Sequence, residues 1–213
     1  MPSVTGFGRM RTGIDKGNIM SNRTANIERK TTETDIKIDL NLDGEGHYDL
    51  DTGVGFFDHM LAHLGKHSKC DLKVKAKGDL EVDAHHSVED IGICLGECLG
   101  QALGSKKGIA RYGNSSLPME DTLANVAIDL SGRPFCVYNV SFRTERIGDF
   151  DVELIEEFLR AFSNAGKFNI HVNVPYGTNS HHIAEAIFKA IGQALGAAVR
   201  DIGGGIPSTK GVL

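Results

Sequence analysis

The sequence predicts an α/β (α+β) protein formed by tandem duplication of a βαβα-type half-domain. The motif His-His-x-x-Glu occurs twice, at residues 85–89 and 181–185, each time at the start of an apolar, helix-like run. The segments before the two motifs show strand-like and helix-like spacing of apolar residues in the same order. Two units are too few for a solenoid, so we expect them to pack face to face, with helices inside and sheets outside.

The first half is predicted as strand, helix, strand and helix. Apolar and polar residues alternate at 34–42, which indicates a strand with one face in solvent, and Asp43-Gly44 ends it in a turn. Residues 56–64 have the apolar spacing of a helix, and residues 72–76 alternate as a second strand. The first His-His motif then opens a helix that extends to about Leu103.

The second half repeats this order. Residues 123–130 and 168–174 alternate as strands, residues 135–142 are rich in β-forming side chains, and residues 154–162 have helical spacing. The second His-His motif opens the last helix, which extends to about Arg200. The matching order of elements is the reason for predicting a duplication.

The predicted boundaries follow from this repeat. Residues 26–110 form the first half-domain and residues 111–202 the second, with the joint at 104–118. Residues 1–25 contain several glycines and lack apolar periodicity, so we expect a flexible N-terminal extension. Residues 203–213 begin with three glycines and are predicted to form a C-terminal tail.

The composition fits a globular chain and argues against a nucleic-acid or membrane partner. The 213 residues are 40% hydrophobic and 24% charged, which suits one domain or two fused halves with a shared core. The net charge of −5 disfavours binding to a phosphate backbone, and no apolar run is long enough to cross a membrane. The four cysteines form no C-x-x-C pair, so we expect a reducing, cytoplasmic setting with Cys94 and Cys98 in the core.

Glycines within the helix-like runs predict close packing between helices. Glycine destabilises a helix interior by about 1 kcal/mol relative to alanine, so its repeated use there needs a reason. We expect the missing side chains to let helix backbones approach each other. The positions concerned are Gly92, Gly96, Gly100, Gly192 and Gly196.

Histidines in and beside the repeated elements, with the two motif glutamates, form a candidate set of metal ligands. Residues three or four apart share a helix face, so each glutamate can point the same way as a histidine of its own motif. Adjacent histidines point about 100° apart, so one pair can serve two different ions. Mixed imidazole and carboxylate ligands permit Mn, Fe, Ni, Co or Zn. The candidates are His59, His85, His86, Glu89, His171, His181, His182 and Glu185.

Two further histidines are open to two interpretations. His63 and His67 follow His59 at spacings of four residues and therefore share its helix face. They could contact the metal ligands or the substrate. They could equally belong to a solvated helix face.

The segments that carry these residues closely resemble the imidazoleglycerol-phosphate dehydratases, a family of histidine biosynthesis. The resemblance covers nearly all of residues 27–213. Its most specific segments are Phe-Asp-His-Met-Leu at 57–61, His-His-Ser-Val-Glu-Asp-Ile at 85–91 and Pro-Ser-Thr-Lys-Gly at 207–211. One departure is Asn173, which stands where an arginine is usual in the family.

The resemblance implies a fold, an activity and an assembly. The fold would be a helical layer sandwiched between two four-stranded sheets. The activity would be a hydro-lyase reaction, the dehydration of D-erythro-imidazole glycerol phosphate to imidazole acetol phosphate. Each active site would use two Mn²⁺ ions, and the chains would assemble into a 24-subunit shell.

The resemblance also implies roles for individual residues. It supports the eight metal ligands named above, and catalytic roles for Glu33, Glu89 and Glu185, with Glu33 as the candidate acid or base. The cationic side chains would hold the phosphate dianion, and the C-terminal tail would take part. The implied substrate contacts are Glu33, His67, Arg111, Arg133, Lys189, Ser208, Thr209 and Lys210.

The reaction must remove a poorly acidic C–H proton and expel a hydroxide. Metal ions on the ring nitrogens would allow a metal-bound imidazolate to form and to expel the hydroxyl through a diazafulvene-like intermediate. We therefore expect a mechanism in which the metal ions and fixed charges stabilise the developing charge.

Three other functions are open from the residues alone. A two-metal phosphatase or hydrolase would usually carry more aspartates than this mainly histidine set. A metal-storage shell would not need Arg111, Arg133 or the tail. An RNA-binding module would not be expected at a net charge of −5.

Overall fold

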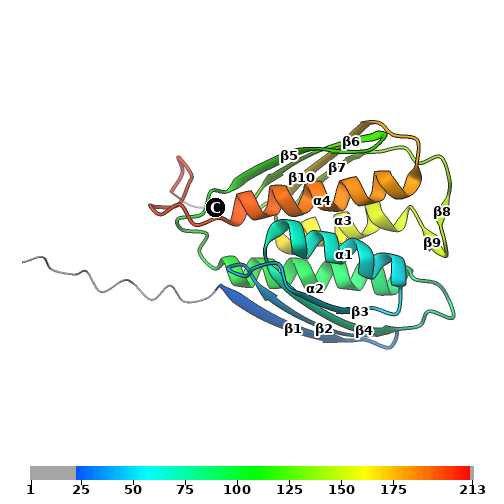
Figure 1. Cartoon of the computed structure of the whole chain (residues 1–213). Helices are drawn as coiled ribbons and strands as arrows, with labels where there is room; N and C mark the ends of the chain where they lie inside the picture. Colours follow the sequence, from blue (N-terminus) through cyan, green and yellow to red (C-terminus); the bar gives the residue numbers. More distant parts are fainter. Residues whose placement is uncertain (1–22, 212–213) are drawn as a thin grey trace, which may run out of the picture.

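The computed structural model describes residues 23–211 as three layers, in which the helices lie between two four-stranded sheets (Figure 1). The predicted α/β fold with a central helical layer is therefore confirmed. The predicted flexible extension lies almost entirely outside the described residues, as do the last two residues of the tail.

The first sheet has the strand order β1-β2-β4-β3. β1, β2 and β4 are antiparallel neighbours, and β3 runs parallel to β4. Ile36 and Ile38 of β2 are almost completely buried, as the alternating pattern predicts. The elements are β1 (Thr24–Lys30), β2 (Thr34–Asn41), β3 (Tyr48–Asp51), α1 (Gly55–Ser68), β4 (Asp71–Gly78) and α2 (His85–Leu103).

The second sheet has the equivalent order, β5-β6-β10-β7, with the same pairing directions. The elements are β5 (Tyr112–Met119), β6 (Thr122–Asp129), β7 (Phe135–Asn139), α3 (Leu154–Gly166), β10 (Asn169–Tyr176) and α4 (Ser180–Val199). One hairpin, β8 (Arg146–Ile147) with β9 (Phe150–Asp151), is inserted before α3 and has no counterpart in the described first half. The order and pairing support the duplication, whose boundaries stay a prediction.

Two edge strands correct the sequence prediction. β1 begins at Thr24, inside the predicted extension, and β5 occupies much of the predicted joint at 104–118. β5 lacks an apolar alternation because its inner face lies directly on α4. A Cβ atom on Gly113 would stand 1.8 Å from the carbonyl oxygen of Ala194, so no larger side chain fits there. A strand that packs through glycine leaves no hydrophobic signal.

The helices pair across the two halves. α2 packs on its own sheet and against α3, whereas α4 packs on its own sheet and against α1. Each half therefore contributes one helix to each pair (Figure 1). The hydrophobic core is continuous through the helical layer and includes the stacked rings of Phe158, Phe162 and Phe188.

Glycines make these helix pairs close, as predicted. A Cβ atom on Gly96 of α2 would lie 2.6 Å from the carbonyl oxygen of Phe162 in α3. A Cβ atom on Gly196 of α4 would lie 2.5 Å from the carbonyl oxygen of Ser68 in α1. Gly92 and Gly192 have similar contacts, but a Cβ on Gly100 would meet nothing within 4 Å, so the prediction was wrong for Gly100.

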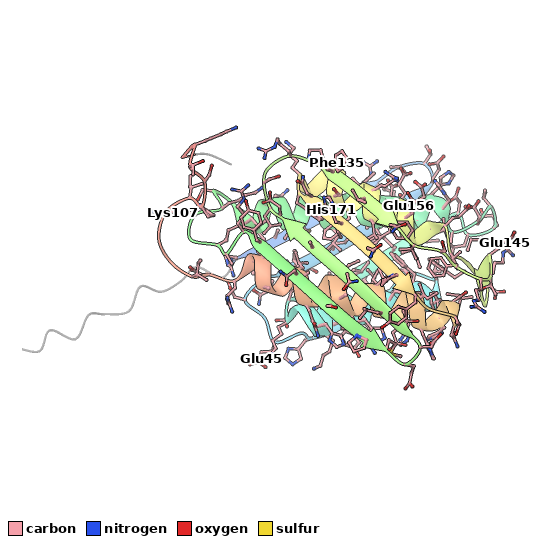
Figure 2. The ribbon with its side chains drawn as sticks, turned by 90° about the horizontal axis from the view of Figure 1, so that it is seen from above. Glu45, Lys107, Phe135, Glu145, Glu156 and His171 are labelled. Carbon is pink, nitrogen blue, oxygen red and sulfur yellow. The ribbon has the colours of Figure 1, made fainter. Side chains whose placement is uncertain are left out.

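The outer faces of the two sheets differ in charge. The first sheet exposes ion pairs such as Lys75 with Asp49 and Lys37 with Glu28. The second sheet exposes Tyr112, Phe135 and His171, of which Phe135 and His171 are labelled in the view from above in Figure 2. Surface aromatic side chains are enriched where proteins meet other proteins.

The residues that the structure describes contain neither a membrane-spanning helix nor a disulfide bond. No helix among them is long and apolar enough to cross a membrane. The four cysteines are free, and Cys94 and Cys98 are completely buried in the core, as predicted.

We expect Gly96→Ala to lower the free energy of unfolding by about 1–3 kcal/mol, because the added methyl group forces α2 away from α3. The matched control is Gly100→Ala, which adds a methyl group to the same helix in open space and should raise stability by up to about 1 kcal/mol. Urea denaturation of both variants checks this. Equal effects would contradict the proposed role of the close contact.

Candidate metal and phosphate sites

The contact between α1 and α4 brings three predicted metal ligands together. His59, His181 and Glu185 each offer one ligand atom, and these atoms lie within 4.8 Å of one another. Glu185 Oε2 is 3.4 Å from His181 Nε2 and 4.0 Å from His59 Nε2. His181 and Glu185 share a face of α4, and His59 reaches them from α1. We call these three residues the convergent group.

Residues at the start of α4 fix the direction of its first turn. The Asn179 side chain accepts hydrogen bonds from the backbone N–H groups of His181 and His182. Such a cap satisfies donors that an α-helix leaves unpaired at its first turn. At the start of α2, Asp83 accepts a hydrogen bond of 2.7 Å from the backbone N–H of His85.

Glu185 is buried and ionised. Burial alone would oppose ionisation, but the hydrogen bond from Lys189 and the charge of Lys189 outweigh it and lower the pKa of Glu185. Lys189 Nζ lies 2.5 Å from Glu185 Oε1, and His63 Nε2 lies 3.2 Å from the same oxygen. Within this chain, Lys189 therefore compensates the charge of Glu185.

His63 contacts the convergent group, with Nε2 3.2 Å from Glu185 Oε1 and 3.3 Å from His59 Nε2, whereas the role of His67 stays a prediction. Burial lowers the pKa of His63 to about 4, and burial also lowers the pKa of His67. Both rings are therefore neutral near pH 7. A neutral imidazole keeps a lone pair for a cation or a proton.

The second histidine of each motif is held by an aspartate that the sequence did not single out. His86 Nδ1 lies 3.0 Å from Asp79 Oδ2, and His182 Nδ1 lies 2.7 Å from Asp121 Oδ1. A carboxylate only accepts, so Nδ1 donates the proton and Nε2 is left free as a potential ligand. Histidine ligands of metal ions commonly have such a partner. Asp79 lies seven residues before its histidine and could have been found beside the motif, whereas Asp121 lies 61 residues before its histidine and only the fold brings the two together.

Glu33, the candidate acid or base, lies beside His86. Its Oε2 is 3.9 Å from His86 Nδ1, and its side chain is half exposed. The hydrogen bond with Asp79, with the nearby charge of Glu33, raises the pKa of His86 above its ordinary value of 6.5. Glu33 is therefore free to contact a ligand at the start of α2.

The remaining predicted ligands do not converge within one chain. His85 and Glu89 lie one turn apart on α2, but among the described residues they join no group of three potential ligands. His171 is exposed on the outer face of β10, where its ring is 6.4 Å from that of Phe135 (Figure 2). The single chain thus presents one convergent group and several separate ligands.

A hollow of about 760 Å³ opens beside His59. The β8–β9 hairpin forms one wall, and Phe150 of that hairpin packs against Phe56 at 5.2 Å between ring centroids. Phe56 in turn places its ring 5.4 Å from that of His181. The inserted hairpin therefore supports the end of the helical layer that carries the convergent group.

Five of the predicted substrate contacts line one hollow of about 560 Å³ at the C-terminal tail. Arg111 donates to Asp129 at 2.7 and 3.2 Å and to the carbonyl oxygen of Pro207 at 2.8 Å, which ties the tail to β6. Cationic side chains and a hydroxyl around one space suit a phosphate group. The five are Arg111, Arg133, Ser208, Thr209 and Lys210.

This phosphate hollow and the convergent group lie at opposite ends of α4. The backbone N–H of Arg111 donates to the carbonyl oxygen of Ala198, near the end of the helix, whereas His181 stands at its start. At 1.5 Å per residue, the 20-residue helix separates the two by on the order of 30 Å. Lys189 lies between them and does not line the hollow.

Comparison with known proteins identifies the family. The sequence model of the imidazoleglycerol-phosphate dehydratase family matches residues 52–195. The chain belongs to this family. The enzyme of Ruegeria pomeroyi is 56% identical over 194 residues, which covers 90% of this chain and 100% of the relative. That of Clostridium acetobutylicum is 55% identical and covers 89% of this chain and 97% of the relative.

Solved structures agree with this assignment. The crystal structure of imidazoleglycerol-phosphate dehydratase from Staphylococcus aureus matches with a TM-score of 0.76 and 39% identity, over 84% of this chain and 99% of that one. The enzyme from Pyrococcus furiosus, crystallised in complex with (S)-C348, matches with a TM-score of 0.77 and 36% identity, over 88% and 100%. The expected family and the expected hydro-lyase class are confirmed.

We expect Asp121→Asn to weaken binding of Mn²⁺ and to destabilise the turn before α4. The hydrogen bond from Thr178 and that from His182 lower the pKa of Asp121 far below its ordinary value of 3.8. This stabilisation is therefore present above about pH 4 and is lost as the pH falls towards the lower pKa of the folded state.

Urea denaturation from pH 7 to pH 3 tests the pH effect, and metal titration tests the ligand effect. The variant should have a lower midpoint at pH 7, with a smaller difference from wild type at pH 3. Its affinity for Mn²⁺ should fall roughly 10–100-fold. A stability difference that grows on acidification would refute this account.

Proposed function

We propose that this protein dehydrates D-erythro-imidazole glycerol phosphate to imidazole acetol phosphate in histidine biosynthesis. The observation that carries the proposal is the convergence of His59, His181 and Glu185 in a chain of this family. The phosphate hollow supplies the second requirement, a place for the phosphate group.

The donor set fits a divalent metal ion, and we propose Mn²⁺ with two ions in each active site. Imidazole nitrogen and carboxylate oxygen together suit borderline first-row cations. His59, His181 and Glu185 would hold one ion, and His85, His86, Glu89, His171 and His182 would supply the other ligands. When bound, the ions supply Lewis acidity toward the imidazole ring of the substrate.

The proposed proton transfer belongs to Glu33. Its exposed carboxylate stands beside His86, at the end of the helical layer where α2 begins. From there it would accept the C2 proton of a substrate whose ring lies against the metal ligands. Glu89 and Glu185 would act as ligand carboxylates that hold their positions during the reaction.

The proposed phosphate contacts are made by the tail hollow. Arg133 and Lys210 are exposed there and have no ion pair within the described residues, so their charges are available to a dianion. Arg111 is already paired with Asp129 and chiefly holds the tail in place. His67 and Lys189 lie near the metal ligands, so we propose that they meet the ring end of the substrate.

We propose that complete active sites form between chains, in a shell of 24 subunits. Imidazole glycerol phosphate joins its ring to its phosphate through only three carbons, so it cannot span on the order of 30 Å along α4. A neighbouring chain would place its phosphate hollow against the metal ligands of this one. The exposed His171, on the outer face of the second sheet, would supply a metal ligand to such a neighbouring chain.

The decisive experiment is incubation of the purified protein with imidazole glycerol phosphate and Mn²⁺. We expect imidazole acetol phosphate to form, and chelation of the metal to stop its formation. Release of inorganic phosphate instead would indicate the hydrolase alternative. Normal turnover by metal-free protein would refute the proposal.

Glu185→Ala should lower the metal content and abolish turnover, because it removes one of three converging ligands and leaves Lys189 without its partner. Elemental analysis and the dehydration assay measure the two effects. Glu97→Ala, an exposed glutamate on α2, is the control. Full metal content in the Glu185 variant would remove this residue from the ligand set.

Lys210→Ala should raise the substrate KM at least tenfold while the metal content stays unchanged, because the phosphate loses a charged contact. Steady-state kinetics measure this, with Lys77→Ala on the outer face of the first sheet as the control. Unchanged kinetics in the Lys210 variant would argue against a phosphate site at the tail.

A further inference from the structure

The two oxygens of the Glu185 carboxylate face different partners. Oε2 points to His181 Nε2 at 3.4 Å and His59 Nε2 at 4.0 Å, within the convergent group. Oε1 contacts Lys189 Nζ at 2.5 Å and His63 Nε2 at 3.2 Å, and the same His63 nitrogen lies 3.3 Å from His59 Nε2. One oxygen thus faces the other two candidate ligands, and the other faces Lys189 and His63.

His63 lies on α1 where this helix faces α4. It follows His59 by one turn, with 4.5 Å between the ring centroids, and its side chain is 17% exposed. His63 does not belong to the convergent group of potential ligands.

Nε2 of His63 lies close to two polar atoms, 3.2 Å from Oε1 of Glu185 and 3.3 Å from Nε2 of His59. A carboxylate oxygen can only accept, so an N–H group at Nε2 of His63 has Oε1 of Glu185 within reach as an acceptor. Lys189 adds charge at the same oxygen, but a lysine ammonium is a flexible point charge with little directional preference.

We propose that His63 is a positioning residue that holds Oε1 of Glu185 and thereby keeps Oε2 turned toward the metal ion. This inference rests on the proposed function, because it presupposes an ion held by Glu185. Hydrogen-bonded partners of metal ligands fix the orientation of the ligand, and their loss typically weakens metal binding 10–100-fold. His63 would therefore set metal affinity without touching the metal.

Titration of the metal-free protein with Mn²⁺ tests this, by calorimetry or by the electron paramagnetic resonance signal of free Mn²⁺. We expect His63→Leu, which removes the donor, to weaken binding at the tighter site roughly 10–100-fold. His63→Gln keeps an N–H donor on a side chain of similar reach and should bind within about threefold of wild type. His47→Leu, at an exposed histidine near the first sheet, should bind like wild type.

His63→Asn provides a second test if the leucine variant does not fold. Its shorter side chain keeps a polar amide but cannot reach Oε1, so it should weaken binding as His63→Leu does. Wild-type affinity in a folded Leu or Asn variant would overturn the positioning role. Equal losses in the Gln and Leu variants would overturn it too, because they would make the imidazole itself a ligand.

Failure of this inference is distinguishable from failure of the proposed function. If the wild-type protein bound no Mn²⁺, or turned over substrate normally without it, the proposed function would fall. If the wild type bound Mn²⁺ and dehydrated the substrate while His63→Leu bound equally well, only the role of His63 would fall.

Discussion

The close contact between helices of opposite halves is the constraint on which the site depends. Gly192 and Gly196 let α4 approach the backbone of α1, and this approach brings His59 to His181 and Glu185. A bulkier residue at either position would separate the candidate ligand His59 from His181 and Glu185 without changing any of the three. The packing of α4 on α1 therefore also determines the geometry of the convergent group. The contact between α2 and α3 is equally close, because glycines of α2 lie against the backbone of α3.

The duplication provides two similar motifs in different surroundings. His86 and His182 each donate from Nδ1 to an aspartate, so the orientation of the second histidine is preserved in both halves. The first histidines differ, because His181 meets Glu185 and His59 while His85 joins no such group among the described residues. The β8–β9 hairpin adds to this difference. Its Phe150 packs against Phe56, which lies beside His181 of the second motif. The two motifs thus share candidate ligands but differ in the environments of those ligands.

Periodicity and spacing predicted the parts of the structure that obey a local rule. β2 alternates, the helices have apolar faces, and His181 and Glu185 lie one turn apart, so all were visible in the sequence. β5 was not, because Gly113 packs on α4 without an apolar side chain. Asp121 was not either, because it lies 61 residues before His182 and only the fold brings the two together, whereas Asp79 lies seven residues before His86. Family resemblance pointed to the cations of the tail, but their shared hollow required the tertiary structure.

The length of α4 has a genetic consequence. If ring and phosphate of one substrate are held by different chains, a defect in the metal ligands and a defect in the tail need not affect the same active site. Two inactive mutant alleles, one at Glu185 and one at Lys210, would then produce mixed shells in which some sites pair an intact metal group with an intact tail. The length of α4 would then be detectable genetically, because two inactive alleles of this one gene would restore activity when expressed together.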